Sequence, residues 1–304
     1  MNVSLEQLQA FVSAADHGSF SAAARALGKA QSAISTQINS LEVDLGVELF
    51  QRTGRNPVLT PIGERLLQEA RVTLDRRRHL IGIAASHEAG VEGKLVLAFD
   101  EIFPQSALAP ILADFARHFP YVELRILFPL MEDVGALVSA GEVDLGVMWR
   151  NESYLTELDF RCIGWAPIRL ICGREHPFAM QPEVEYEDLK RARQILVSSH
   201  RGPDSPRLRV ASDVWWVASH WVALQLVTAN IGWALVSAEV IASSPQSADL
   251  VVPALGFDAF TAFPIAIDMV WRKNRPRGPA VRWLQQRLSA SPIAQVRFGR
   301  PASP

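Results

Sequence analysis

The sequence of 304 residues is poor in cysteine and shows no excess of charge of either sign. Its two cysteines, Cys162 and Cys172, cannot form a disulfide framework, so we expect a protein of the reducing cytoplasm. Lys and Arg number 30 against 32 Asp and Glu, and the net charge of −2 gives no indication of a nucleic-acid-binding protein. Hydrophobic residues make up 49% of the chain, which excludes a wholly disordered protein.

Long hydrophobic runs are also missing. The first residues lack the cationic start and the apolar run of a signal peptide. The most apolar stretch, residues 210–241, is interrupted by charged and polar residues and by a glycine. The sequence therefore predicts neither a membrane span nor a membrane partner.

The short motifs of common catalytic sites are absent as well. The sequence contains no GxSxG, HExxH, CxxC, GxGxxG or Walker loop. Its seven histidines are scattered, and the two cysteines, ten residues apart, have no His partner at metal-binding spacing. We therefore expect no enzymatic activity, no metal and no cofactor, with an α/β enzyme kept as an alternative.

The first 60 residues are rich in helix signals. Apolar residues three and four apart predict a helix that ends at Gly18. Ser19 begins a second, Ala-rich helix that ends at Gly28, and a third helix spans about residues 31–45. Two short extended pieces around residues 53–57 then predict a hairpin or wing. Three helices in this order suit a helix-turn-helix. The later helix of that motif enters the DNA major groove, and here it would be the one at about 31–45. A generic helical subdomain is the alternative.

The third helix carries the candidate base contacts. Its outward residues are short or polar, and none is acidic: Gln31, Ser32, Ser35, Thr36 and Asn39. Residues 1–90 contain nine basic and nine acidic side chains, so phosphate affinity must come from local placement. The cations expected to provide it are Arg25, Lys29, Arg52 and Arg55.

A longer helix is predicted from Thr60-Pro61 to about residue 86. Leu67, Leu74 and Ile81 repeat every seven residues along it. This spacing fits a coiled-coil seam for dimerisation, and it fits equally an amphipathic helix that lies on its own domain. Residues 90–93 then form a short linker.

Beyond residue 94, strand-like and helix-like segments alternate, which predicts a parallel α/β sheet. Strands are expected near 95–99, 122–126, 145–148, 168–172, 195–198, 233–236 and 265–271. Helices are expected near 106–119, 131–140, 214–229 and 281–289. The helix at 214–229 would carry Trp215, Trp216 and Trp221.

Several segments together resemble LysR-type transcriptional regulators. SAAARAL (21–27), QSAISTQI (31–38) and LEVDLGVELFQR (41–52) resemble the winged helix-turn-helix of that family, and LTPIG (59–63) resembles the start of its linker helix. GEVDLGV (141–147), EHPFA (175–179) and ANIGWALV (229–236) resemble effector-domain segments in the same order. Thr36 stands where the family often has arginine.

The resemblance implies an α/β protein with an N-terminal all-α winged helix-turn-helix (1–60), a linker and dimerisation helix (61–89) and a two-lobed effector domain like a periplasmic binding protein (90–304). Lobe one would span about 94–163 and 267–304, and lobe two about 164–266. It further implies a cytoplasmic regulator whose partners are double-stranded DNA, a small-molecule effector and copies of itself, as a dimer or tetramer. A solute-binding protein is an alternative that fits the C-terminal part alone.

Effector contacts are expected beyond the carboxyl ends of strands. The candidates are Asp100, Glu101, Ile102, Phe103, Arg150, Ser198, Ser199, His200 and Trp216. The acidic pair Asp100-Glu101 departs from the small hydroxyl residues frequent there in the family. One interpretation is that the acidic pair stabilises the N-terminus of the following helix. The other is that it pairs with an amine-bearing effector, whose cation would also interact favourably with nearby aromatic rings. Arg150 is the candidate that would receive a carboxylate instead.

Overall fold

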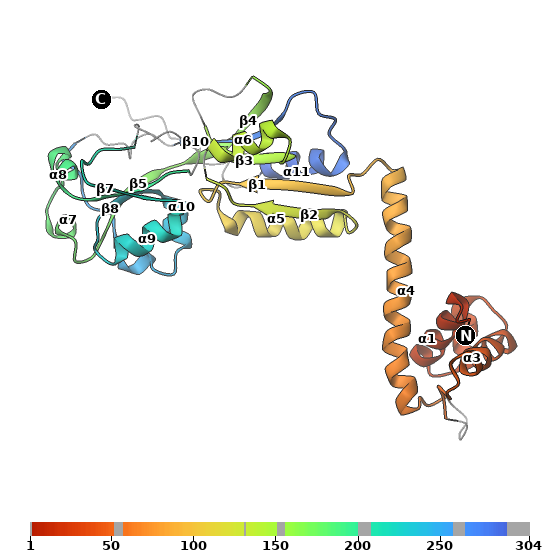
Figure 1. Ribbon diagram of the computed structural model, residues 1–304. Helices are drawn as coiled ribbons and strands as arrows, with labels where there is room; N and C mark the ends of the chain where they lie inside the picture. Colours follow the sequence, from red (N-terminus) through yellow and green to blue (C-terminus); the bar gives the residue numbers. More distant parts are fainter. Residues whose placement is uncertain are drawn as a thin grey trace. The chain divides into compact units, whose positions relative to one another are not determined.

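The computed structural model describes residues 2–51, 57–130, 132–150, 156–199, 208–257 and 265–290. The chain forms two compact units, Met1–Glu88 and Ala89–Pro304 (Figure 1). None of the described helices combines the length and the apolar character that a bilayer crossing requires.

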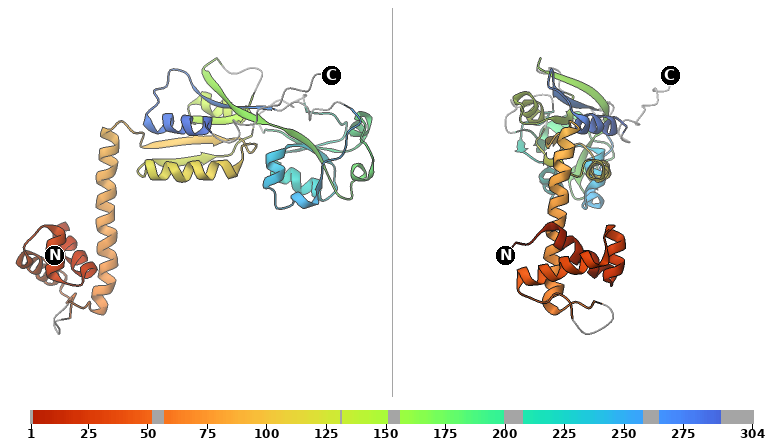
Figure 2. Two further views of the ribbon diagram at one scale, coloured as in Figure 1. Left: turned by 180° about the vertical axis from the view of Figure 1, so that it is seen from behind. Right: turned by 90° about the vertical axis from the view of Figure 1, so that its right-hand side faces the viewer.

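The first unit consists of four helices, which Figure 2 shows from two further sides: α1 (Leu5–His17), α2 (Phe20–Leu27), α3 (Gln31–Leu45) and α4 (Pro61–Glu88). Polar caps set their starts, because Ser4 and Gln7 form a capping box and the Ser19 hydroxyl accepts the Ala22 N–H. Gly28, at φ 63°, makes the left-handed turn between α2 and α3. The helices enclose one apolar core that includes Phe11.

The wing follows α3. Phe50 and Leu59 form an antiparallel bridge, and the Gln51 N–H donates to the Val58 carbonyl at 2.7 Å. Its tip, with Arg52 and Arg55, lies outside the described residues. The first turn of α4 packs so closely on this segment that a Cβ at Gly63 would lie 2.1 Å from the Leu49 carbonyl oxygen, which explains the glycine there.

Helix α4 lies on its own domain along most of the predicted seam. Leu67 is 6% exposed within the domain core, and half-buried Leu74 lines a hollow beside α1 and α2. Leu67 and Leu74 therefore pack on their own domain, as the amphipathic-helix alternative predicts. Because Leu67 is buried there, a second chain cannot contact it. Ile81 alone of the three is fully on the surface, at 50% exposed.

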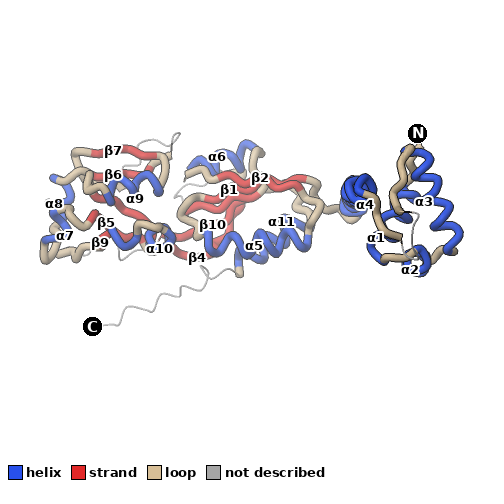
Figure 3. The backbone as a smooth tube through the Cα atoms, turned by 90° about the horizontal axis from the view of Figure 1, so that it is seen from below, coloured by secondary structure: helices blue, strands red, loops and turns tan. Residues whose placement is uncertain are grey.

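The second unit contains two five-stranded sheets within the described residues (Figure 3). The first has the order β2-β1-β3-β10-β4, with β1 Lys94–Phe99, β2 Glu123–Leu127, β3 Leu145–Trp149, β4 Leu158–Ala166 and β10 Ile265–Arg272. The second has the order β7-β6-β8-β5-β9, with β5 Ile168–Gly173, β6 Gln194–Val197, β7 Val214–Val217, β8 Trp233–Ser237 and β9 Leu250–Val251.

Helices cover both faces of each sheet. In lobe one, α5 (Gln105–His118) and α11 (Pro279–Ser289) cover one face and α6 (Glu132–Ala140) covers the other. Lobe two contains α7 (Pro177–Met180), α8 (Tyr186–Arg191), α9 (His220–Thr228), α10 (Ala238–Ser243) and the 3₁₀ turn Ser247–Asp249. One buried apolar cluster contains residues of both lobes, among them Leu97 of β1 and Leu170 of β5.

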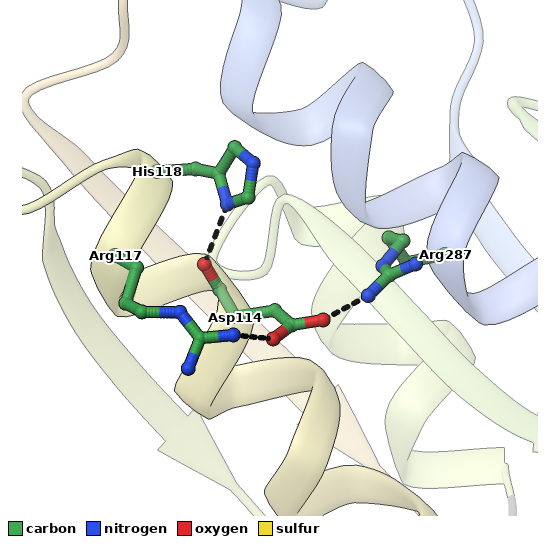
Figure 4. A network of polar contacts seen from close by, with 4 residues as sticks. All are labelled: Asp114, Arg117, His118 and Arg287. Atoms are coloured by element: carbon green, nitrogen blue, oxygen red, sulfur yellow. Dashed lines mark hydrogen bonds and ion pairs between the residues drawn. The ribbon is translucent and has the colours of Figure 1, made fainter.

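Polar contacts and aromatic rings join α5 to α11. The Asp114 carboxylate accepts hydrogen bonds from Arg117 on its own helix and from Arg287 on α11 (Figure 4). His118 Nδ1 lies 2.9 Å from the Asp114 carbonyl oxygen, and the Phe115 and Trp283 rings meet edge to face at 5.9 Å. These contacts fix α11 on lobe one, although Asp114 and Arg287 are 173 residues apart in the sequence.

Three sequence-based expectations about this unit are wrong. The sheets are mixed rather than purely parallel, because β10 runs antiparallel to β3 and β4, and β5 antiparallel to β8. Strand β4 was not predicted, since its buried positions do not alternate regularly. The expected helix at 214–229 is strand β7 followed by the shorter α9, because four β-favouring residues precede the helix cap Ser219.

The ends of β4 and β10 show where the chain passes between the two sheets. All of β4 belongs to the first sheet, so the chain leaves that sheet after Ala166, close to the expected boundary at about residue 164. It is back in lobe one at Ile265, where β10 begins.

Candidate DNA interface and effector site

The outer face of α3 is polar and accessible within the first unit. Gln31, Ser32, Thr36 and Asn39 are exposed, and Ser35 is half-buried. Ile34, Ile38 and Leu41 occupy the opposite face and are at most 1% exposed. Because the apolar stripe anchors the helix, its polar side chains are held in one orientation. The Ser21 hydroxyl donates to Gln31 Oε1 at 2.8 Å, which orients the first of them.

The acidic residues near the end of α3 are engaged inside the domain. Glu42 Oε1 accepts the backbone N–H groups of Leu49 and Phe50 at 2.7 and 3.2 Å, which ties the start of the wing to α3. Asp44 Oδ2 accepts a hydrogen bond from Gln7 Nε2 on α1 at 2.9 Å. These hydrogen bonds keep both carboxylates away from the polar face of α3. The sequence pattern did not reveal these contacts.

The expected phosphate contacts divide into three cases. Arg25 is exposed on α2, and no ion pair involves it among the described residues. Lys29 Nζ pairs with Glu6 at 3.0 Å, and this hydrogen bond and charge lower the pKa of the Glu6 carboxyl. The exposed pair is weakly held, so it leaves Lys29 able to exchange partners. Arg52 and Arg55 lie outside the described residues.

The expected effector residues after β1 take different places. Asp100 is 1% exposed, and its Oδ1 accepts the Ile102 N–H at 2.9 Å, so it shapes the turn at the end of the strand. Ile102 and Phe103 are each 2% exposed and belong to the apolar core beneath the site rather than to its lining. Glu101 is half-buried, and its carboxylate reaches lobe two.

Glu101 joins the two lobes at the N-terminus of α9. Its Oε2 accepts the His220 N–H at 2.8 Å, and the Ser219 hydroxyl lies 3.4 Å from both of its carboxylate oxygens. Burial raises the pKa of the Glu101 carboxyl, and the hydrogen bonds from His220 and Ser219 counteract that rise. Sequence reasoning missed Ser219 and His220, because the predicted helix started before them.

The imidazole of His220 is enclosed beside this contact. The residue is 5% exposed, and its Nδ1 has no hydrogen-bond partner among the described residues. Burial lowers the pKa of the ring to about 4, so the side chain is neutral at physiological pH.

Arg150 follows β3 and is bound to a buried carboxylate. Its Nε and a terminal nitrogen donate to the two oxygens of Asp268 at 2.8 and 2.9 Å, and Asp268 is fully buried on β10. The guanidinium also lies 5.7 Å from the centre of the Phe160 ring. Arg150, the residue expected to bind an effector carboxylate, is thus already bound to the carboxylate of Asp268, 118 residues away in the sequence.

The remaining candidates come from lobe two. Ser198 is half-buried after β6, and Ser199 is 8% exposed. Trp216 is 39% exposed and lies on β7, the outermost strand of its sheet, rather than on a helix. His200 lies outside the described residues. The structure therefore brings Glu101 against Ser219 and His220, and holds Arg150 in an ion pair of its own.

Two families match this architecture. Residues 5–64 match the family described as bacterial regulatory helix-turn-helix protein, lysR family, and residues 88–291 match the LysR substrate binding domain. The chain belongs to the LysR family of transcriptional regulators. It is thus a transcriptional regulator with a DNA-binding helix-turn-helix and an effector-binding domain, in a family of regulators rather than enzymes.

Two relatives of this LysR-type regulator align with it over nearly the whole chain. It is 28% identical to the HTH-type transcriptional regulator AceR of Acinetobacter baumannii, over 93% of this chain and 96% of that protein. It is 25% identical to the uncharacterized regulator YnfL of Escherichia coli, over 93% and 96%. The crystal structure of full-length BenM has the same fold, with a TM-score of 0.53 at 22% identity, over 99% of this chain and 100% of that one.

Proposed function

We propose that this LysR-type regulator reads its DNA site with Gln31, Ser32, Ser35, Thr36 and Asn39 of α3, and that Arg25 and Lys29 contact phosphates. The observation that supports this is the exposed polar face of α3. The nearby acids Glu42 and Asp44 do not add negative charge to that face, because both accept hydrogen bonds inside the domain. Polar side chains without negative charge can meet base edges in the major groove. Arg52 and Arg55 of the wing complete the proposed phosphate contacts.

Replacing Gln31 with alanine should weaken binding to the cognate site by about 1–3 kcal/mol and leave binding to random DNA unchanged, because a base contact carries sequence information. Arg25→Ala should weaken binding to both DNAs alike and reduce the salt dependence. The measurement is a gel shift over a range of salt, using DNA from upstream of the protein's own gene.

Gln37→Ala is the matched control. It is the same substitution on the same helix, but Gln37 Nε2 donates to Glu6 at 3.0 Å. This variant should keep the wild-type preference for the cognate site. Equal losses on cognate and random DNA for Gln31→Ala would show that α3 does not read the bases through this face.

The effector is proposed to bind between the lobes of the C-terminal domain, near Glu101, Ser198, Ser199 and Trp216. Glu101 and α9 already contact each other across the lobes, so a ligand at this point would change how the lobes meet. Such a ligand shifts DNA binding only by its difference in affinity for two arrangements of the protein.

Self-association is proposed to use the outer side of α4. Val72, Leu80 and Ile83 are 54%, 68% and 46% exposed. At 3.6 residues per turn they fall within about 80° of one another, on the side opposite Leu67 and Leu74. An apolar stripe left open on a helix is what a second copy of the helix would cover.

Leu80→Asp should therefore lower the sedimentation coefficient of the full chain, because it places a charge in the proposed interface. Leu74→Asp should instead lower the melting temperature of the DNA-binding domain, since Leu74 is half-buried against α1 and α2. Analytical ultracentrifugation and circular dichroism distinguish the two effects. An unchanged sedimentation profile for Leu80→Asp would rule out this face.

A further inference from the structure

The N-terminus of α9 already holds an anion. A helix of nine residues presents free N–H groups and a partial positive charge at its start, which is a favourable place for a negative group. Here the occupant is the Glu101 carboxylate, which comes from the other lobe and accepts the His220 N–H at 2.8 Å. The Ser219 side chain both caps the helix through the Trp221 N–H and reaches toward Glu101.

Among the described residues, no cation forms an ion pair with the Glu101 carboxylate. Asp100 precedes Glu101 and is buried. Arg150, directly after β3, is paired with the buried Asp268. The His220 ring is neutral and more than nine-tenths buried, with Nδ1 unpartnered among the described residues. Phe128, at the end of the adjacent strand β2, leaves 46% of its surface exposed.

We propose that Glu101 sets the charge of the effector: as the internal anion of the α9 N-terminus it excludes carboxylates and pairs with an alkylammonium group. This deepens the proposed effector function and rests on it. The hydrogen bonds to α9 fix the carboxylate, and its remaining lone pairs accept from an ammonium. A ligand carboxylate would find the helix donors taken and would meet a like charge.

The test compares two probes of equal chain length and opposite charge, pentylamine and hexanoate, on the full-length protein by isothermal titration calorimetry. The wild type should bind pentylamine and not hexanoate. Glu101→Gln should weaken pentylamine binding at least tenfold. Glu101→Ala, which vacates the helix start, should gain hexanoate binding. Glu123→Gln is the control, because that carboxylate is 68% exposed and pairs with Lys94.

Three results would overturn the proposal: no binding of pentylamine to the wild type at millimolar concentration, unchanged pentylamine affinity in Glu101→Gln, or hexanoate binding as tight in the wild type as in Glu101→Ala. A general loss of structure cannot produce a reversal of charge preference, so the Ala variant separates specificity from folding. A gel shift on every variant keeps the two proposals apart, because retained DNA binding without the charge preference would refute this inference alone.

Discussion

Arg150→Met should lower the free energy of unfolding of the effector domain by about 3 kcal/mol, at the lower end of what removing one partner of a buried ion pair costs. The reason is the position of Asp268, whose carboxylate is fully buried and receives two hydrogen bonds from the guanidinium. Without Arg150, that carboxylate stays buried with less compensation for its lost hydration. Arg150 is partly exposed, at 41%, which places the effect below the upper end of the range.

Tryptophan fluorescence during urea unfolding reports on this domain alone, because all eight tryptophans lie between residues 149 and 283. Arg117→Met is the control, since Arg117 is 73% exposed and its partner Asp114 keeps the contact with Arg287. It should cost less than about 1 kcal/mol. Adding Asp268→Asn to Arg150→Met should recover part of the loss. Equal stabilities for the wild type and Arg150→Met would contradict the proposed origin of the effect.

Acidification from pH 6.5 to 4 should destabilise the effector domain by about 3 kcal/mol through His220 alone. Burial lowers the pKa of this imidazole from 6.5 to about 4 in the folded protein. Between these values the unfolded chain binds a proton that the folded chain does not, so stability falls as the pH falls, by about 1.4 kcal/mol per unit. The contribution is fully present above pH 6.5 and is lost on the way to pH 4.

Two other groups have shifted pKa values whose effect on the pH dependence has a known sign. Burial also lowers the pKa of His176, which adds to the loss on acidification. The raised pKa of Glu101 has the opposite effect, because the folded protein takes up that proton first. Both groups remain in a His220→Gln variant, so the difference between variant and wild type isolates His220.

Urea unfolding followed by tryptophan fluorescence at several pH values provides the measurement. His220→Gln should show a flatter dependence of the unfolding free energy on pH than the wild type, whatever its stability at pH 7. His220→Phe serves as a second variant that fills more of the buried space. Parallel curves for the wild type and both variants would show that the ring is protonated without cost in the folded state.

Local signals in the sequence were sufficient where the physics is local. Apolar residues three and four apart, serine caps and glycines after Leu27 and Leu45 predicted α1 to α3 and the polar side of α3, and the structure has them. Each of these signals acts within a few residues, through helix geometry or capping hydrogen bonds. The family followed from the same segments, and residues 5–64 and 88–291 match it.

Periodicity alone failed where two packings satisfy it equally. The heptad of Leu67, Leu74 and Ile81 fitted a seam between chains, but two of the three residues face the domain itself. The run from Val214 fitted a helix on its apolar content, but the edge of a sheet takes its first four residues. In both cases the outcome depends on which neighbouring surface is available, and that surface is built by distant parts of the chain.

The sequence by itself determined the helix-turn-helix, its polar outer face and the family, because caps and periodic apolar residues act over one or two helical turns. Only the tertiary structure decided that Glu101 caps α9, 119 residues further on, and that Arg150 is held by Asp268. Such pairs form when the ends of separate strands and helices meet, and charged groups that become buried there must find partners. The spacing of residues along the chain does not predict which groups become partners.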